Sequence, residues 1–283
     1  MKKVLVTGAN GYIGRHIVKT LLDCGFNVDA CDFRFDGVDE RANKIYTPIF
    51  NGEEDIYDKL GKPDICIHMA WRNGFVHNSG THIEDLYNHY TFLSNMISGG
   101  LTHLSVMGTM HEVGYWEGPI DENSPTNPSS LYGIAKNCLR QAIELRAKDD
   151  KMIFQWLRAY YITGDDLKSN SIFSKITKME MEGKDKFPFT TGKNKYDFIS
   201  VEELSEQIVA ASTQTEIRGI INCCSGNPIS LAEKVEEFIK KKNFKIKLQY
   251  GAFPDREYDS LAVWGDNNKI KKILELTPKK LGV

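Results

Sequence analysis

The sequence predicts an α/β fold: a doubly wound parallel β-sheet with helices on both faces and a small α+β lobe attached to it. Three observations support this prediction. Short apolar runs typical of buried strands lie at 4–6, 27–31, 64–69 and 101–107. Helical patterns separate these runs, and a glycine-rich turn follows the first of them. Strands and helices that alternate in this way form parallel pairs with right-handed crossovers.

The expected elements follow one another regularly through the first half of the chain. Apolar residues recur at helical spacing after the glycine-rich turn and predict a first helix that ends near residue 25. Further along we expect, in chain order, helix 81–98, helix 131–147, strand 154–161 and helices near 171–182, 201–212 and 230–242. The alternation loosens beyond residue 163.

This change of pattern predicts two parts in the chain. A dinucleotide-binding domain is expected over 1–165 together with about 194–218. A substrate-binding lobe is expected over about 166–193 and 219–283, because these stretches are too small and irregular to form a separate domain of standard size.

Composition excludes several classes of protein. The 283 residues are 41% hydrophobic and 26% charged, as in ordinary globular domains, and the formal net charge is −2. A nearly neutral chain has no strong field to attract nucleic acid or anionic lipid, so we expect neither as a partner. The sequence holds no run of about 18 apolar residues and no secretion signal, which indicates a cytoplasmic protein.

Cysteines and histidines give no sign of a disulfide framework or a metal centre. The six cysteines are scattered without Cys-x-x-Cys spacing, as expected of reduced structural thiols. The seven histidines lack the carboxylate partners of a zinc site, and His77 and His82 fall in a loop and at a helix start. We therefore expect no metal cofactor.

The glycine-rich turn between the first strand and the first helix predicts dinucleotide binding. Residues 7–14 read Thr-Gly-Ala-Asn-Gly-Tyr-Ile-Gly. Glycines let the backbone turn tightly and approach a pyrophosphate, and the N-terminus of the following helix offers N–H groups to phosphate. The candidate cofactor-binding residues of this turn are Gly8, Asn10, Gly11, Tyr12, Ile13 and Gly14.

Asp32 at the end of the second strand bears on the choice of cofactor. A carboxylate at that place accepts hydrogen bonds from both hydroxyl groups of an adenosine ribose and repels a 2′-phosphate, which favours NAD. Arg34 lies two residues further on and is able to neutralise a 2′-phosphate, so NADP stays open. Otherwise Arg34 is a solvated loop charge.

Tyr132 and Lys136 are the candidate catalytic pair. Their spacing puts both side chains on one face of the helix expected over 131–147. A tyrosine is a poor acid–base group at neutral pH, but a nearby ammonium group stabilises the phenolate and lowers the tyrosine pKa. Such a pair exchanges a proton with a hydroxyl or carbonyl group while a nicotinamide exchanges hydride. Both residues are also expected to contact the cofactor.

Taken together, these residues resemble the extended short-chain dehydrogenase/reductase family, which includes the NAD-dependent epimerases and dehydratases. Further segments similar to the family's motifs lie at 68–71, 157–164, 197–202 and 221–226. The resemblance implies a Rossmann-type domain and places Met69, Ala70 and Trp71 along the cofactor. Trp71 departs from the small residue usual at its position, which reshapes the nicotinamide side of the site.

The resemblance also implies a third catalytic group, a Ser or Thr that polarises the substrate oxygen. Thr109 fits best, because Glu-Val-Gly follows it closely as in the family, and Ser105 is the competing candidate. Related dehydratases carry Asp-Glu directly after this threonine. Met110 and His111 stand there in this chain, which argues against dehydration.

Residues further along the chain are expected to bind the substrate. His111 is expected to contact it, with proton abstraction next to a ketone as the alternative. The segment 255–269 resembles the family's ending, which implies that Arg256 holds a diphosphate, a task suited to a planar bidentate donor, unless it belongs to a surface charge cluster. Asn170 is a candidate for holding the sugar or a phosphate, and Phe187 and Phe189 either flank the nucleobase or pack in the core.

The reaction that the resemblance favours is reduction of the C4 ketone of a nucleotide-linked 4-keto-6-deoxyhexose, as in enzymes of the dTDP-4-dehydro-6-deoxyglucose reductase type. A 4-epimerase of the UDP-glucose/galactose type is the main alternative. A non-catalytic, dinucleotide-sensing regulator is a further one, which the Tyr132–Lys136 pair disfavours. Helices corresponding to 81–98 and 131–147 build the dimer interface in relatives, so we also expect a homodimer.

Overall fold

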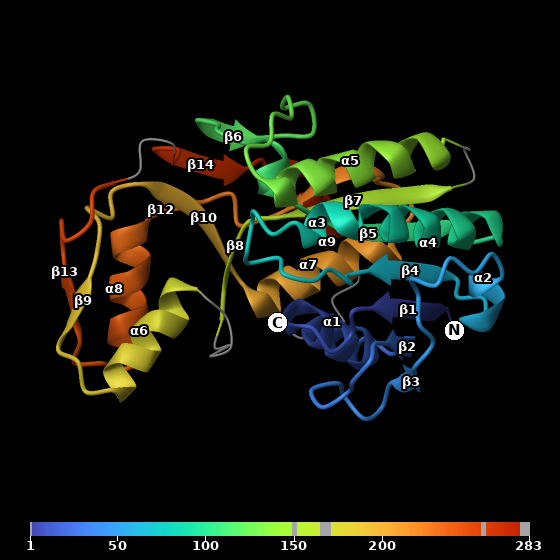
Figure 1. Ribbon diagram of the computed structural model, residues 1–283, viewed down its shortest axis with the longest axis horizontal. Helices are drawn as coiled ribbons and strands as arrows, with labels where there is room; N and C mark the ends of the chain where they lie inside the picture. The colour runs from blue at the N-terminus through green and yellow to red at the C-terminus, as the bar shows by residue number, and fades with distance from the viewer. Residues whose placement is uncertain (1, 149–151, 165–170, 256–258, 278–283) are drawn as a thin grey trace.

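The computed structural model describes residues 2–148, 152–164, 171–255 and 259–277 (Figure 1). Within these residues a seven-stranded sheet forms the centre of the molecule, in the order β11-β7-β5-β4-β1-β2-β3. Its strands are β1 (Lys3–Thr7), β2 (Asn27–Cys31), β3 (Asn43–Ile45), β4 (Ile65–His68), β5 (His103–Thr109), β7 (Ile153–Ala159) and β11 (Gly219–Cys223). Each strand of this sheet runs parallel to its neighbours, which confirms the predicted α/β fold.

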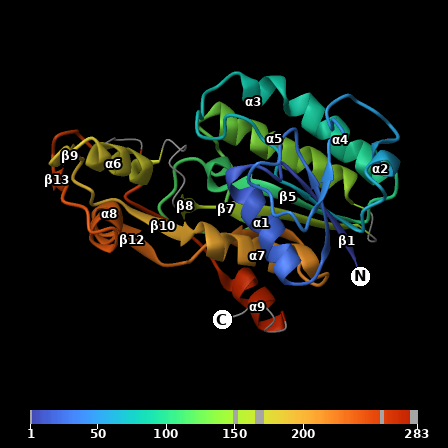
Figure 2. The same ribbon diagram turned by 90° about the horizontal axis from the view of Figure 1, so that it is seen from below.

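Helices cover both faces of this sheet (Figure 2). One face carries α1 (Tyr12–Asp23), α7 (Val201–Thr213) and α9 (Asn268–Leu276), and the other carries α2 (Ile56–Lys59), α3 (Thr81–Glu84), α4 (Leu86–Ser98) and α5 (Leu131–Arg146). Alternate side chains of a strand serve the two layers: Val4 and Val6 pack with Ile17 of α1, whereas Leu5 packs with Phe92 of α4. Each layer thus has its own hydrophobic core.

The strand order reverses beside β1, because β2 lies on one side of it and β4 on the other. Ligands of doubly wound sheets bind at the carboxyl ends of the strands at such a reversal. The loops that follow β1, β4 and β5 are therefore the expected location of the site.

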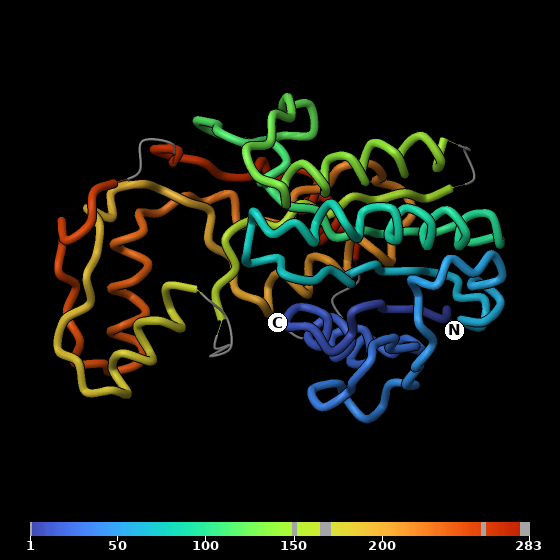
Figure 3. Tube along the Cα trace, viewed as in Figure 1, coloured from blue at the N-terminus to red at the C-terminus, as the bar shows by residue number. Residues whose placement is uncertain are grey.

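A lobe extends from one end of the sheet, as the yellow and orange parts of the trace in Figure 3 show. Within the described residues, a five-stranded sheet joins it to the main body. The strands of this sheet are β6 (Gly118–Ile120), β8 (Tyr161–Thr163), β10 (Lys195–Ser200), β12 (Pro228–Ser230) and β14 (Ala262–Gly265). The lobe also contains α6 (Ile172–Met181), β9 (Lys186–Pro188), α8 (Leu231–Lys241) and β13 (Lys247–Gln249). A hydrophobic cluster separate from those of the main sheet fills it.

The structure corrects the expected boundaries between the two parts. Residues 219–223, expected in the lobe, form β11 and pair with β7 in the main sheet, where the side chains of Ile221 and Cys223 are fully buried. The helix α9 also lies on the main body, against α7 and β11. Conversely, β10 was expected in the dinucleotide-binding domain but pairs with β12 and β14 of the smaller sheet.

Phe187 and Phe189 pack in the core of the lobe, with 8% and 2% of their surfaces exposed. This places them among other apolar side chains and not against a nucleobase. Every helix in the described parts of the chain is too short or too polar to span a bilayer.

Asp197 on β10 holds the smaller sheet together. Its carboxylate is fully buried and accepts hydrogen bonds from the Ser225 N–H and hydroxyl groups at 2.8 and 2.6 Å. It also accepts from the N–H groups of Gly226 at 2.9 Å and Gly265 at 3.0 Å. One side chain therefore links β10 to β14 and to the turn before β12.

Replacing Asp197 with alanine is expected to lower the free energy of unfolding by about 3 kcal/mol, because buried N–H groups would lose their charged acceptor. Urea denaturation followed by circular dichroism measures this change. Asp58→Ala is the matched control, since Asp58 forms an exposed ion pair with Lys62 and should unfold like the wild type. Equal stability of the two variants would contradict the role assigned to Asp197.

Candidate active site

A cavity of about 1340 Å³ lies at the carboxyl ends of the central strands, between the main sheet and the lobe. Its lining includes many of the predicted site residues, namely Gly8, Gly11, Tyr12, Ile13, Gly14, Met69, Trp71, Thr109, His111, Tyr132 and Lys136. Asn10, Asp32, Arg34 and Ala70 are not part of the lining. Asn170 and Arg256 lie outside the described residues.

The glycine-rich turn is shaped so that side chains would not fit. Gly8 has a φ of +67°, and a Cβ on it would lie 2.7 Å from the backbone of Ala70. A Cβ on Gly14 would lie 2.2 Å from the carbonyl oxygen of Gly8. Gly11 is the N-cap of α1 and supplies no side-chain cap, and the start of a helix is a place where N–H groups bind phosphate. The turn therefore fits the pyrophosphate of a dinucleotide.

Asp32 is held in a fixed orientation directly after β2. Its carboxylate accepts hydrogen bonds from the N–H groups of Asn10 at 2.9 Å and Phe33 at 2.7 Å. The side-chain oxygen of Asn10 in turn accepts a hydrogen bond from the Gly37 N–H at 2.9 Å. Arg34 is exposed on the same loop. A carboxylate fixed beside the glycine turn fits an adenosine ribose with free hydroxyl groups, which is the feature of NAD.

The helix α5 brings the predicted catalytic pair to the end of β5. It begins after Ser130, whose side chain accepts a hydrogen bond from the Gly133 N–H. The side chain of Thr109, the last residue of β5, lies next to the hydroxyl group of Tyr132 and acts to lower its pKa. Lys136, one helical turn further on, donates from Nζ to the carbonyl oxygen of Met107 at 2.7 Å. These three predicted side chains thus meet in the cavity.

Ser105, the alternative to Thr109, is directed elsewhere. It is fully buried, and its hydroxyl group donates to the side-chain oxygen of Gln155 at 2.7 Å. The reason is the register of β5, in which Ser105 pairs with Gln155 on β7 in the interior of the sheet. Thr109 is therefore the hydroxyl group near Tyr132.

Burial shifts the pKa values of the pair in opposite directions. It raises the pKa of Tyr132, and the negative charge of Glu112 acts in the same direction. Burial lowers the pKa of Lys136 to about 7, although the charge of Glu112 opposes this shift. The ammonium group of Lys136 therefore exchanges its proton near neutral pH.

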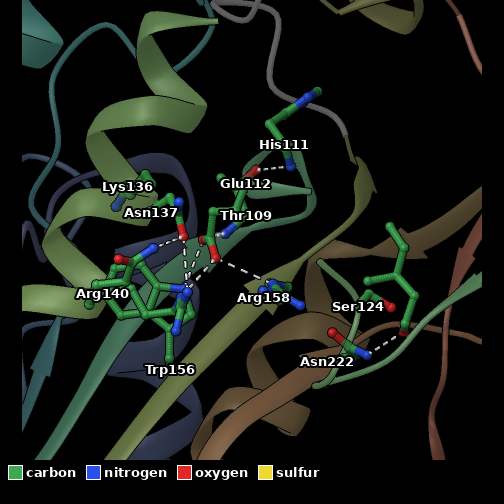
Figure 4. A network of polar contacts seen from close by, with 12 residues as sticks. Thr109, His111, Glu112, Ser124, Lys136, Asn137, Arg140, Trp156, Arg158 and Asn222 are labelled. Carbon is green, nitrogen blue, oxygen red and sulfur yellow. Dashed lines mark hydrogen bonds and ion pairs between the residues drawn. The ribbon is translucent and has the colours of Figure 1, made fainter. Parts of the chain in front are cut away.

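Glu112 anchors the end of β5 from inside the protein (Figure 4). It is fully buried, and its Oε1 accepts hydrogen bonds from the Thr109 N–H at 2.8 Å and from Trp156 Nε1 at 2.7 Å. Its Oε2 accepts from Arg158 Nε at 3.3 Å and lies 3.8 Å from Arg140 Nε. Because Thr109 and Glu112 also form a capping box around the short helix η1 (Met110–Glu112), the backbone of Thr109 is fixed.

His111 points away from this network in Figure 4 and lines the cavity. The centre of its ring lies 4.3 Å from that of His77, which stacks on Tyr132 with a centroid distance of 5.6 Å. Burial, followed by the proximity of His77, lowers the pKa of His111 to about 4. His111 is therefore neutral at pH 7 and is able to donate or accept a hydrogen bond.

Several residues of the cavity could not be found from the sequence. The loop 73–78 contributes much of the lining and is attached to α5 by a hydrogen bond from the Tyr132 N–H to the His77 carbonyl oxygen at 2.8 Å. Tyr160, Tyr161 and Phe173 line the opposite side, from β8 and α6 and their surroundings. Tyr160 and Tyr161 lie in the segment 157–164, which resembles a family motif, whereas Phe173 belongs to no such segment. The described part of the chain holds no cluster of three or more metal-ligating side chains.

The low pKa of Lys136 predicts a pH-dependent cost to stability. The folded state releases the lysine proton near pH 7, and the unfolded state releases it near pH 10.5. As the pH is raised from 7 to 10.5, the free energy of unfolding of the wild type should therefore increase relative to that of a Lys136→Met variant. The total change is about 5 kcal/mol, and below pH 7 the difference should level off. Urea unfolding at a series of pH values measures it.

Lys62→Met is the control for this comparison, because Lys62 is exposed and its stability difference from the wild type should stay constant over the same range. A constant difference for Lys136→Met as well would show that Lys136 ionises normally.

Comparison with known proteins places these features in a family. The family model described as "NAD dependent epimerase/dehydratase family" matches residues 4–224. The dTDP-6-deoxy-L-talose 4-dehydrogenase (NAD(+)) of Aggregatibacter actinomycetemcomitans is 47% identical, over 93% of this chain and 98% of that protein. The UDP-glucose 4-epimerase of Lactobacillus helveticus is 25% identical, over 98% of this chain and 92% of its own length.

Solved structures show the same fold. The UDP-glucose 4-epimerase of Thermotoga maritima superposes with a TM-score of 0.81 at 20% identity, covering 95% of this chain and 91% of that one. The sequence match, the glycine turn and the position of Tyr132 and Lys136 agree with one another. The chain therefore belongs to the NAD-dependent epimerase/dehydratase family, and its cofactor is NAD.

Proposed function

We propose that this NAD-dependent nucleotide-sugar enzyme catalyses oxidation or reduction at C4 of a dTDP-linked 6-deoxyhexose. The main support for the proposal is that Thr109, Tyr132 and Lys136 line the same cavity as the glycine-rich turn. The 47% identity to a dTDP-6-deoxy-L-talose 4-dehydrogenase, over almost the full length of both chains, supports this choice of sugar and nucleotide. Such a dehydrogenase runs the reverse of the ketoreduction expected from the sequence.

In this proposal Tyr132 moves the proton and its neighbours prepare it. Bound NAD would supply hydride transfer to or from the sugar carbon. The phenol oxygen of Tyr132 takes the proton of the C4 hydroxyl group in oxidation and returns it in reduction. Because burial raises the pKa of Tyr132, a nearby positive charge has to stabilise the phenolate, and Lys136 supplies it. Thr109 donates a hydrogen bond to the same substrate oxygen.

His111 and His77 are proposed to contact the sugar. They line the cavity next to Tyr132, and a neutral imidazole suits hydrogen bonds to sugar hydroxyl groups. A His111 pKa of about 4 makes protonation before the reaction unfavourable at neutral pH. Arg256 and Asn170 remain predictions for the diphosphate and the sugar.

The direct test is an assay at 340 nm with NAD or NADP and dTDP-6-deoxy-L-talose, and with NADH or NADPH and dTDP-4-keto-6-deoxyhexoses, with products identified by NMR. Consumption of one cofactor molecule for each sugar converted would support the proposal. If sugars change configuration at C4 without net change in the cofactor, the protein is an epimerase. Binding of NAD with no turnover of any sugar would indicate a dinucleotide sensor.

Replacing Tyr132 with phenylalanine is expected to lower kcat by about 10³-fold, because the proton would lose its acceptor. The affinity for NAD, measured by calorimetry, should change little. Tyr115→Phe is the matched control. Tyr115 is exposed at the margin of the cavity, and its hydroxyl group donates a hydrogen bond to Glu117 at 2.7 Å. A Tyr132→Phe variant with wild-type kcat would refute the role of the tyrosine.

We also propose that the chain forms a homodimer through α3, α4 and α5, which lie side by side on one face (Figure 2). Large apolar side chains are exposed on these helices, among them Tyr87 at 73% and Leu145 at 63%. Large apolar and aromatic side chains that are exposed on one chain are common in the interfaces between chains.

A Tyr87→Glu/Leu145→Glu double variant should therefore sediment as a monomer in analytical ultracentrifugation, while the wild type sediments as a dimer. The circular dichroism spectrum controls for folding. A monomeric wild type would remove this proposal.

A further inference from the structure

Trp71 contacts the ammonium group of Lys136. The Nζ atom lies 3.9 Å from the centre of the indole ring. Lys136 is 2% exposed, so water has little access to this charge, and the hydrogen bond of Nζ runs to the carbonyl oxygen of Met107 at 2.7 Å. An aromatic face carries partial negative charge and attracts a cation most strongly where water is excluded.

The indole ring of Trp71 is itself held in place. Its Nε1 donates to His82 Nδ1 at 3.0 Å, and His82 Nε2 lies 3.0 Å from the carbonyl oxygen of Val76. Since a carbonyl group only accepts, His82 carries its proton on Nε2 and is free to accept from the indole on Nδ1. The ring also stacks on His89, with a centroid distance of 4.3 Å and an interplanar angle of 17°.

A chain of hydrogen bonds connects His89 to the first strand. His89 Nδ1 lies 2.9 Å from His68 Nε2, and His68 Nδ1 lies 2.8 Å from the hydroxyl group of Thr7 at the end of β1. His68, His82 and His89 are each 1% exposed. The position of the indole is therefore fixed by the same strand ends that form the site.

The groups around Lys136 explain why such a contact matters. Glu112 favours the charged lysine, but it lies behind Thr109 and is already bonded to Trp156 and Arg158. Burial lowers the pKa values of His68 and His89, with the charge of Lys136 adding to the effect, so both stay neutral. Tyr132, on the same helix, is neutral when protonated.

We propose that Trp71 is a positioning residue for Lys136: its indole face holds the buried ammonium group in its charged form at a fixed place beside Tyr132. The inference rests on the proposed function, because the charge of Lys136 matters to the reaction only if Tyr132 exchanges a proton. It also explains the large side chain at a position where the family resemblance led us to expect a small one. The contact itself can be tested without any substrate.

The first experiment records tryptophan fluorescence of the full chain from pH 5 to 9. The emission of Trp71 is obtained by subtracting the spectrum of Trp71→Phe from that of the wild type. It is expected to titrate with a midpoint near the Lys136 pKa of about 7, and to lose this titration in Lys136→Met. Trp264 on β14 provides the control. The difference in fluorescence emission between the wild type and Trp264→Phe should not depend on pH in this range.

A Trp71 emission that is the same in the wild type and in Lys136→Met at every pH would overturn the proposal. So would a titration that persists in Lys136→Met, because the neighbouring histidines would then be its source. Neither outcome depends on sugar turnover, so this experiment can fail while the proposed function holds, and the reverse is also possible.

The second experiment compares Trp71→Phe with Trp71→Leu in the sugar oxidation assay. Phenylalanine keeps an aromatic face and should retain kcat within about threefold, whereas leucine should lower it on the order of tenfold with little change in KM. Without the aromatic face Lys136 loses its proton more readily and Tyr132 is harder to ionise. The rising limb of the rate profile of Trp71→Leu, which depends on ionisation of Tyr132, should therefore move to higher pH. An unchanged profile in Trp71→Leu would show that Trp71 acts on structure alone and would refute the proposal.

Discussion

The fully buried carboxylate of Glu112 is the constraint on which the arrangement of the site depends. It receives hydrogen bonds from the Thr109 N–H, from Trp156 and from Arg158, and it lies beside Arg140. One negative charge therefore connects the end of β5 with β7 and with α5, the helix that carries the proposed catalytic pair. In an interior without water these bonds are strong, and loss of a partner would leave a buried charge uncompensated. The distance between the strand end and the helix is fixed as a result.

Around this anchor the protein places groups that an apolar interior disfavours. Burial raises the pKa of Tyr132 and keeps its hydroxyl group protonated at neutral pH, whereas it lowers the pKa of Lys136 to about 7 at the expense of stability. The neighbouring histidines fit this arrangement because they add no competing positive charge. Burial lowers the pKa of His68 to about 3 and that of His111 to about 4, and both rings offer hydrogen bonds while remaining neutral.

Local patterns made the main features predictable from the sequence. The glycine turn at 7–14 and the Tyr132–Lys136 spacing depend on one strand–helix unit and one helix turn, so short-range periodicity was sufficient. The smaller sheet was not predictable, because it joins short strands from distant parts of the chain. The roles of Glu112 and Trp71 were also hidden, since each depends on partners brought close only by the fold. The boundary at 219 was misplaced because β11 is an edge strand joined to β7 across a long connection.

The central claim is that the site transfers hydrogen between C4 of the sugar and the cofactor with a net change in oxidation state. The most direct test uses dTDP-6-deoxy-L-talose with deuterium at C4, unlabelled NAD and NMR analysis of both products. We predict that the deuterium appears at C4 of the reduced nicotinamide, in an amount equal to the ketone formed. Deuterium that stays at C4 of an epimerised sugar, with no reduced cofactor released, would contradict the account.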